Sequence, residues 1–270
     1  MTSIVYTGHD PFERIDVDGN IVTGARRSRI QKEFWPVLEH AIEYVARIEP
    51  GASVYVYGSV ATGKSRIGRS DVDLVTIGVD AAAATHLASV LSVAHRGLCR
   101  GVEVGAGQLS DYEGSSDEAY GNRVFLRHYC VHLVGPDPAS ALPKYPADRA
   151  AARGFNGDIG LRAVQWRAEL REPTSASLAR GLARKTLFAV AGLVSMHDAV
   201  WTTDRVASAH RWGMIKTELA DALATLASWG FSSSVQPSKA QVQMALDGVV
   251  TEVVAAFQER IGLWRSDGDA

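Results

Sequence analysis

Residues 54–77 read VYVYGSVATGKSRIGRSDVDLVTI, a stretch in which two apolar runs flank a polar segment. Asp71 and Asp73 stand one residue apart at the start of the second run, and residues 60–70 separate them from Gly58-Ser59. In a β-strand, residues i and i+2 point to the same face, so the two carboxylates are predicted to lie together. Mg²⁺ is commonly bound through one or two carboxylates together with the phosphates of a nucleotide. The stretch therefore predicts a site for a divalent cation and a nucleotide.

The same stretch also fits the pattern of a phosphate-binding P-loop, because Gly58 and Gly63 precede Lys64-Ser65 at the spacing of that motif. A P-loop wraps phosphate with backbone amides at the start of a long helix. Here only residues 66–70 separate Ser65 from Asp71, and Gly68 among them disfavours a helical turn. A crossover to a parallel strand needs about a dozen residues or more. The sequence therefore favours a short turn followed by a strand that carries metal ligands.

Composition limits the classes of protein to which the chain can belong. It has 270 residues, of which 46% are hydrophobic and 21% charged, enough for one large domain or two ordinary ones. Its 28 Lys and Arg against 30 Asp and Glu give a net charge of −2, which argues against broad, non-specific binding to nucleic acid. Two cysteines give no disulfide framework. Without a signal-peptide pattern or an apolar run of membrane-spanning length, we expect a cytoplasmic protein with no membrane partner.

The alternation of elements predicts an α+β protein with two domains: residues 1–143 with a mixed sheet and residues 144–270 as an α-helical bundle. In the first domain we expect a hairpin at Asp18-Gly19, helices over 27–48 and 81–94, and strands at Ser53–Tyr57, Val72–Ile77, Gly101–Val104 and Tyr129–Val134. Residues 135–143, rich in proline, form the predicted linker. Helices are then predicted over 148–171, 175–197, 203–227 and 238–264.

Tyr57-Gly58-Ser59 followed by Ser70-Asp71-Val72-Asp73-Leu74 resembles the signature of the DNA polymerase β-like nucleotidyltransferase superfamily. That signature is an apolar strand, Gly-Ser, a spacer of about a dozen residues and Asp-x-Asp in a second strand. The size, the order of the domains and the Leu-Val-Gly-Pro-Asp run at 133–137 are also similar to the aminoglycoside adenylyltransferases of streptomycin and spectinomycin type.

The resemblance implies a set of roles for individual residues. A third acid lies on a following strand in this superfamily, and Glu103 between two valines is the best candidate, as a metal ligand and as the general base. Asp71 and Asp73 would hold Mg²⁺, two ions in the family pattern, beside ATP as the co-substrate. Gly58 and Ser59 would bind the triphosphate, Ser70 would add a hydroxyl, and the cations at 64, 66 and 69 lie in the same turn. The rival acids at 111–118 lie in a Gly/Ser-rich segment that predicts a solvated loop.

The helical half contributes a lysine to this picture. Lys185 shares an otherwise apolar helix face with Leu178, Leu182 and Ala189, where a lysine needs a partner or must reach outward to solvent. In the aminoglycoside enzymes the helical domain supplies a basic residue to the nucleotide, and Lys185 resembles that residue.

The resemblance further implies a small cationic acceptor such as an aminoglycoside, and hence antibiotic resistance. The segment before Lys185 carries no acid to bind an amine-rich sugar, although Asp158, Glu169, Glu172 and Asp198 are available nearby. A toxin-like enzyme acting on tRNA or protein, and a nucleotide-binding module without turnover, remain alternatives. His128, Cys130 and His132 alternate in a predicted strand, where an exposed or substrate-facing strand face is favoured over a Zn²⁺ site because no fourth ligand is in view.

Overall fold

The computed structural model of this chain describes residues 10–170, 176–232 and 235–264, which divide into two compact units. The sheet unit consists of Val22–Ser115 and Asn122–Tyr145. The helical unit consists of residues 10–21, Ser116–Gly121 and the described residues from Pro146 onward. The chain thus changes from sheet to helices after Tyr145, and its first described residues group with the helices.

The sheet unit is built on a four-stranded mixed sheet in the order β5-β4-β3-β6. Strand β4 pairs antiparallel with β3 and parallel with β5, and β6 pairs antiparallel with β3. The predicted α+β fold, with a mixed sheet before a helical region, is confirmed. The strands are β3 (Ser53–Tyr57), β4 (Val72–Ile77), β5 (Val102–Gly107) and β6 (Val131–Val134).

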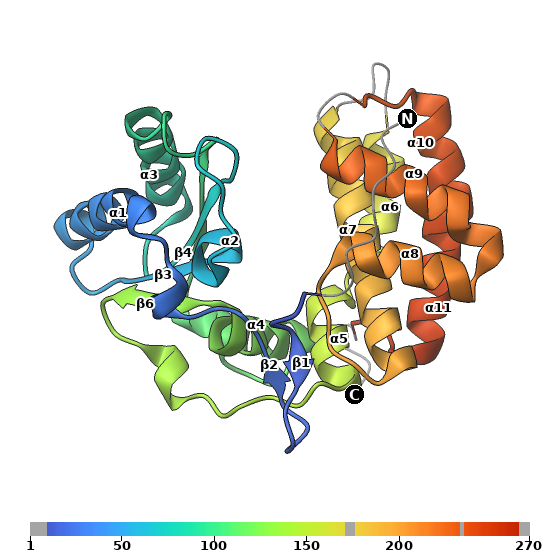
Figure 1. The fold of residues 1–270 in the computed structure, drawn as a ribbon, viewed down its shortest axis with the longest axis horizontal. Helices are drawn as coiled ribbons and strands as arrows, with labels where there is room; N and C mark the ends of the chain where they lie inside the picture. The colour runs from blue at the N-terminus through green and yellow to red at the C-terminus, as the bar shows by residue number, and fades with distance from the viewer. Residues whose placement is uncertain (1–9, 171–175, 233–234, 265–270) are drawn as a thin grey trace. The chain divides into compact units, whose positions relative to one another are not determined.

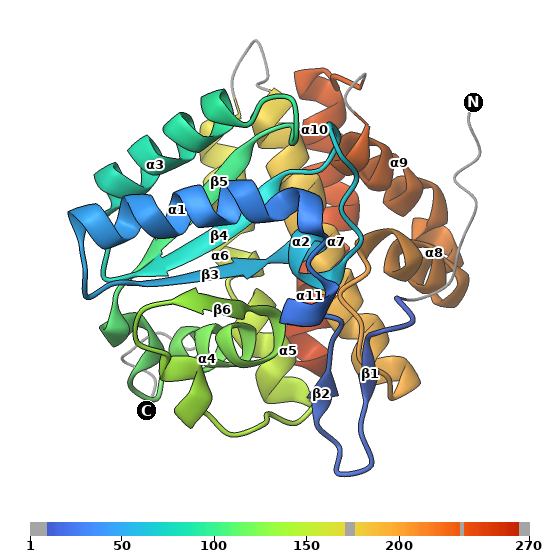
Figure 2. The ribbon, with the colours of Figure 1, turned by 60° about the vertical axis from the view of Figure 1, so that its left-hand side comes forward.

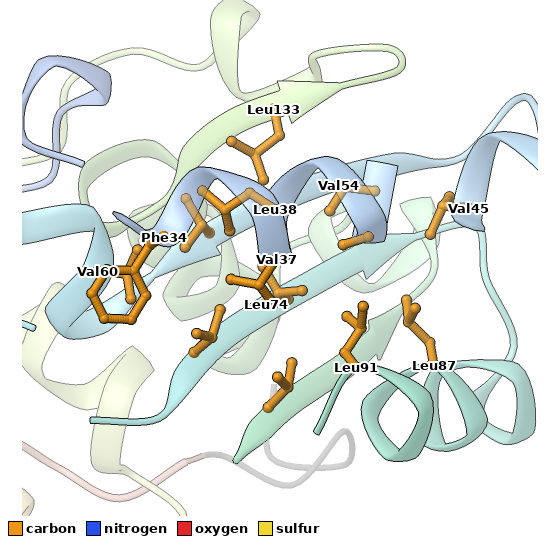
Figure 3. Close-up of a cluster of buried hydrophobic side chains, with 14 of the residues drawn as sticks. Phe34, Val37, Leu38, Val45, Val54, Val60, Leu74, Leu87, Leu91 and Leu133 are labelled. Atoms are coloured by element: carbon orange, nitrogen blue, oxygen red, sulfur yellow. The ribbon is translucent and has the colours of Figure 1, made fainter. Parts of the chain in front are cut away.

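One face of this sheet is covered by helices α1 (Trp35–Ile48) and α3 (Ala81–Ala94), as Figure 2 shows. Side chains such as Leu38 and Leu91 meet the sheet residues Val54 and Leu74 in one buried cluster (Figure 3). Asp80 caps α3 by accepting a hydrogen bond from the Ala83 amide at 2.8 Å. The predicted helix over 27–48 is regular only from Trp35, after two short 3-10 turns, η1 (Arg27–Arg29) and η2 (Lys32–Phe34).

The other face of the sheet is covered by a helix that the sequence did not predict. Helix α4 (Asp117–Tyr129) follows the 3-10 turn η3 (Leu109–Tyr112), and its Leu126 packs against Tyr55, Val75 and Ile77. The strand predicted at Tyr129–Val134 is therefore wrong at its start, since β6 begins at Val131. The prediction of a solvated loop over 111–118 is also wrong at its end, because Asp117 lies in α4 and pairs with Arg153 at 2.7 Å.

The helical unit is organised around its longest described helix, α7, which packs against α8, α9 and α11 (Figure 1). Its inward residues, including Leu182, Leu187 and Leu193, are fully buried. The helices are α5 (Arg149–Asn156), α6 (Ile159–Glu169), α7 (Ala176–Asp198), α8 (Arg205–Ile215), α9 (Ala220–Phe231), α10 (Lys239–Ala245) and α11 (Thr251–Arg260), with 3-10 turns η4 (Pro138–Ala141) and η5 (Thr217–Leu219) and a π-helical turn η6 (Leu246–Val250).

Two of the long predicted helices are interrupted. The helix predicted over 148–171 breaks at Gly157, where the backbone of Trp264 donates to the Gly157 carbonyl at 2.9 Å. A Cβ on Gly157 would lie 2.2 Å from the Trp264 ring, so the break accommodates a segment more than a hundred residues away. The helix predicted over 203–227 breaks at Lys216, which has an extended ψ of 76°.

The hairpin predicted near the N-terminus is confirmed, whereas the long apolar run near the C-terminus was not predicted. The predicted hairpin is present as β1 (Arg14–Ile15) and β2 (Ile21–Val22), with Gly19 at a φ of +84° in its turn. The run Lys239–Arg260 is long and apolar enough to cross a membrane by length and composition alone, although no such run was expected. Its Val242, Val253 and Phe257 side chains are fully buried in the helical unit, and 33% of its apolar window is buried in all.

Candidate functional site

Asp71 and Asp73 lie on the same face at the start of β4. Asp71 immediately precedes the strand and Asp73 is its second residue. Both are partly exposed, whereas Val72 and Leu74 between and after them are fully buried in the cluster under α1 and α3. This alternation is that of a strand with one face in the core, and it turns both carboxylates to the opposite face.

Strand pairing places Glu103 beside this pair. Asp73 is the register partner of Glu103 on β5 and of Tyr57 on β3, so the three residues form one row across the sheet. Neighbouring strands are about 4.8 Å apart, which brings the two carboxylates within reach of a shared ligand. Glu103 is exposed. The row is therefore open to solvent at its β5 end.

Tyr57, which the sequence interpretation did not single out, occupies the other end of this row. Its ring packs edge-on against Phe125 with 5.0 Å between centroids. Its pKa is raised above the ordinary value, first by burial and then by the negative charges of Asp73 and Glu103. The phenol is thus held neutral beside the carboxylates, and its place in the register was the signal that would have identified it.

Gly58 brings the backbone into direct contact with Asp73. Gly58 has a φ of +69°, and a Cβ built there would lie only 2.3 Å from Asp73 Oδ2. It begins the five-residue helix α2 (Gly58–Thr62), whose second residue is Ser59. The structure therefore brings Gly58, Ser59 and Asp73 together at the end of β3, where only glycine leaves room for the carboxylate.

The geometry of α2 excludes the P-loop alternative. The helix ends at Gly63, which has a left-handed φ of +73°, and the next strand runs antiparallel to β3. A P-loop needs a long helix and a parallel neighbour at this point. In the loop that follows, Ser70 Oγ accepts a hydrogen bond from the Arg66 amide at 2.9 Å. Lys64, Arg66 and Arg69 are exposed on the same loop.

Arg100 makes a two-pronged ion pair with Asp71, a contact that the sequence did not suggest. Arg100 Nε donates to Asp71 Oδ1 at 3.0 Å and Nη2 donates to Oδ2. The pKa of Arg100 is raised, chiefly by its hydrogen bonds to Asp71 and further by the charges of Glu103 and Asp73. One guanidinium therefore lies in the field of all three carboxylates.

The donor set at this site suits Mg²⁺. Carboxylate oxygens are hard ligands, and Mg²⁺ bound with a nucleotide needs only one or two of them from the protein. Asp71 and Asp73 supply these oxygens from one face, and Glu103 stands next to Asp73. Within the described ranges, no group of three or more His, Cys, Asp or Glu side chains is arranged to hold a metal ion as it stands. Both oxygens of the Asp71 carboxylate accept a hydrogen bond from Arg100.

Lys185 lies in the helical unit, where it has a buried partner. Its Nζ is 2.6 Å from Asp158 Oδ1 and donates to the Phe155 carbonyl at 2.9 Å. Burial lowers the pKa of Lys185, and the Asp158 carboxylate opposes that shift. The lysine therefore does not simply reach outward to solvent; it is held by an acid at the break between α5 and α6.

The other acids considered for an acceptor are distributed differently. Asp198 pairs with Arg211 at 2.8 Å and with His197 at 2.8 Å, whereas Glu169 is exposed. Glu172 lies outside the described residues. Asp158 is committed to Lys185 and Arg162. These acids do not form a cluster with one another in the described part of the helical unit.

The alternating residues His128, Cys130 and His132 do not share one strand face, because the first lies in α4 and only the last in β6. His128 Nε2 accepts from the Tyr145 amide at 2.9 Å, and His132 Nε2 contacts the Gly135 carbonyl at 3.0 Å. Each imidazole is therefore occupied with local backbone, and the expectation of a single exposed face is wrong.

Comparison with known proteins places this geometry in a wider context. Residues 38–124 match a family model described as a nucleotidyltransferase domain, and this segment contains β3, β4 and β5. The chain is also similar in fold to a crystal structure of spectinomycin adenyltransferase AAD(9) from Enterococcus faecialis with ATP and spectinomycin. That match has a TM-score of 0.54 at 8% identity and covers 81% of this chain and 98% of the other. No curated protein sequence matches the chain.

Proposed function

Because residues 38–124 match a family model described as a nucleotidyltransferase domain, we propose that this protein is an adenylyltransferase of the DNA polymerase β-like type. It transfers AMP from ATP to a hydroxyl group of a small acceptor and releases pyrophosphate. The acceptor in this proposal is an aminoglycoside-type antibiotic, which would make the protein a cytoplasmic resistance enzyme. The observation that carries the proposal is the row in which Asp73 and Glu103 are register partners, with Asp71 on the same face and Gly58 against Asp73.

Asp71 and Asp73 are the proposed metal ligands. When bound, Mg²⁺ would neutralise the phosphate charge that repels an incoming oxygen and would help to orient the reacting oxygens. Glu103 lies one strand away from Asp73, so it can also contact a second ion. Tyr57 flanks the row on its other side, where its ring packs against Phe125.

Glu103 is also the proposed general base. The acceptor oxygen forms a bond to the α-phosphorus of ATP, the bond from that phosphorus to the bridging oxygen breaks, and pyrophosphate leaves. The proton of the acceptor hydroxyl passes to a carboxylate oxygen of Glu103. An exposed carboxylate at the open end of the row suits this role, because an acceptor must reach it from solvent. This placement favours turnover over a nucleotide-binding module without catalysis.

The turn after β3 is the proposed triphosphate site. Gly58 and Ser59 begin α2, and the first amides of a helix point toward its N-terminus, where phosphate oxygens can accept from them. The Ser70 hydroxyl accepts from a backbone amide and still has its own hydrogen to donate. Lys185 is the proposed contact from the helical unit, with Asp158 holding its ammonium in place.

The proposal is tested by incubating the protein with Mg²⁺, ATP labelled in the adenine, and separate members of an aminoglycoside panel that includes spectinomycin and streptomycin. We expect pyrophosphate release with at least one of them, together with transfer of the label to that compound. Asp73→Asn is expected to abolish both signals. Label transferred to tRNA or protein instead would favour the toxin-like alternative, and tight ATP binding without any release would favour the non-catalytic module.

A further inference from the structure

Arg100 occupies the carboxylate that the proposed chemistry assigns to the metal. Its guanidinium binds both oxygens of Asp71 in the fork-like arrangement that makes arginine–carboxylate pairs strong. The Asp71 side chain is only 18% exposed, whereas that of Arg100 is 62% exposed. The carboxylate is thus mostly buried, and the guanidinium paired with it is mostly exposed.

Backbone hydrogen bonds fix the position from which Arg100 reaches Asp71. The Arg100 amide donates to the Ser70 carbonyl at 3.0 Å, and the Val72 amide donates to the Gly101 carbonyl at 3.0 Å. These two bonds extend the β4–β5 pairing by one step beyond the strands. Arg100 therefore lies directly beside Asp71 through local backbone geometry, and its side chain can leave without disturbing that geometry.

The charges in this corner explain why a cation is present. Three carboxylates lie on one face, those of Asp71, Asp73 and Glu103. Their negative charges repel one another unless a positive charge lies nearby. Arg100 supplies one positive charge at Asp71. A divalent cation that binds the Asp71 oxygens meets the positive charge of the guanidinium at the same carboxylate, so the two cations compete for it.

We propose that Arg100 is a built-in counter-ion that occupies Asp71 in the empty protein and competes with the divalent metal for it. The inference rests on the proposed function for the role of Asp71 as a metal ligand. The protein then binds the free metal ion weakly. It binds a metal–nucleotide complex more tightly, because the phosphates give the displaced guanidinium a new partner. Arg100 acts here as a positioning residue and makes occupancy of the metal site depend on the nucleotide.

The test is a titration of Mn²⁺, as a spectroscopic substitute for Mg²⁺, into nucleotide-free protein followed by electron paramagnetic resonance. Arg100→Ala is expected to bind Mn²⁺ about fivefold more tightly than wild type, a factor typical of removing one exposed ion pair of good geometry. Arg100→Lys, which keeps the charge without the fork, is expected to lie between the two. Arg96→Ala removes an exposed arginine from the same α3–β5 connection and is expected to match wild type.

Two outcomes separate this inference from the proposed function. Unchanged or weaker Mn²⁺ binding by Arg100→Ala, in a protein with a wild-type circular dichroism spectrum, overturns the counter-ion role. If Arg100→Ala does not fold, the Arg100→Lys titration decides, and binding no tighter than wild type overturns it. Adding Asp71→Asn to Arg100→Ala should abolish the tighter Mn²⁺ binding expected of Arg100→Ala. If Asp71→Asn has no effect on Mn²⁺ binding with or without ATP, then the proposed metal site itself is wrong.

Discussion

The carboxylate of Asp73 packs against the α-carbon of Gly58, so closely that a Cβ added to Gly58 would lie 2.3 Å from Oδ2. This contact joins the end of β3 to the start of β4 and fixes one proposed metal ligand against the proposed triphosphate turn. Only glycine fits at position 58 while Asp73 keeps this position. The Gly-Ser and Asp-x-Asp parts of the signature are therefore in direct contact. Their spacing in the sequence is the outcome of an antiparallel turn that brings them into contact.

Replacing Gly58 by alanine should therefore move Asp73 and impair catalysis. We expect Gly58→Ala to lower kcat/KM by about 100-fold, as displacement of a reacting group by an ångström can do. Gly68→Ala is the matched control, because Gly68 has nearly the same φ, +70°, but nothing within 4 Å of an added Cβ. Both variants should lose about 1 kcal/mol of stability to backbone strain, and Gly58→Ala should lose more because its Cβ overlaps Asp73. Equal activity of the two in steady-state assays would contradict the role of the contact.

Removing the proposed general base should separate binding from chemistry. Glu103→Gln keeps the size and hydrogen-bonding reach of the side chain but cannot accept the proton, so kcat is expected to fall by about 10²–10⁴-fold. Calorimetric binding of Mg²⁺–ATP should stay within a few-fold of wild type, because Asp71 and Asp73 remain. Glu113→Gln changes an exposed acid of the same unit and should leave both quantities unchanged. A fully active Glu103→Gln enzyme would remove this assignment.

Lys185 is expected to act on the nucleotide as well as on stability. Lys185→Ala should raise the KM for ATP about tenfold, the loss of one charge-assisted hydrogen bond. It should also lower the midpoint of thermal unfolding, because Asp158 loses its closest cationic partner. Lys216→Ala removes a more exposed lysine of the same unit and should change neither value. A lowered unfolding midpoint with an unchanged KM would mean that Lys185 is only structural.

The Asp198–Arg211 pair predicts a pH-dependent contribution to stability. The hydrogen bond from Arg211, with help from His197, lowers the pKa of Asp198 to about 2, against an ordinary value of ~3.9. A carboxyl with a lowered folded-state pKa stabilises the protein fully above its unfolded pKa and loses that effect as pH falls toward the folded value. The free energy of unfolding of wild type should therefore exceed that of Asp198→Asn by about 1 kcal/mol at neutral pH, after allowance for solvent screening.

Urea unfolding at a series of pH values measures that difference, which should shrink between about pH 4 and pH 2. Glu259→Gln serves as the control, because Glu259 is an exposed acid on α11 that pairs with no cation among the described residues. A difference between wild type and Asp198→Asn that is independent of pH would rule out the ion pair as its source.

Local pattern in the sequence was enough to predict the centre of the sheet unit. The bounds of β3, β4 and α3 agree with the runs that predicted them; β3 ends before Gly58, β4 begins after Asp71 and α3 begins after Asp80. The placement of Glu103 beside Asp73 follows from the same reasoning, since a strand, a helix and a further strand bring parallel neighbours into register. The roles of these carboxylates remain predictions.

Features that depend on distant partners were not predictable in this way. Helix α4 was missed because Gly121 interrupts its pattern, and that glycine is required where α4 crosses Gly154 with no space for a Cβ. The break at Gly157 depends on Trp264, and the Arg100–Asp71 pair depends on how two loops align beyond their strands. Each of these is set by tertiary contact, which a single sequence read by local periodicity does not contain.

The most direct test of the central claim is a crystal structure of the protein with Mg²⁺ and a non-hydrolysable ATP analogue. We expect a metal ion about 2.1 Å from carboxylate oxygens of both Asp71 and Asp73, with the triphosphate against the amides of Gly58 and Ser59. A nucleotide bound elsewhere, or one bound at this turn with both carboxylates clear of metal, would contradict it.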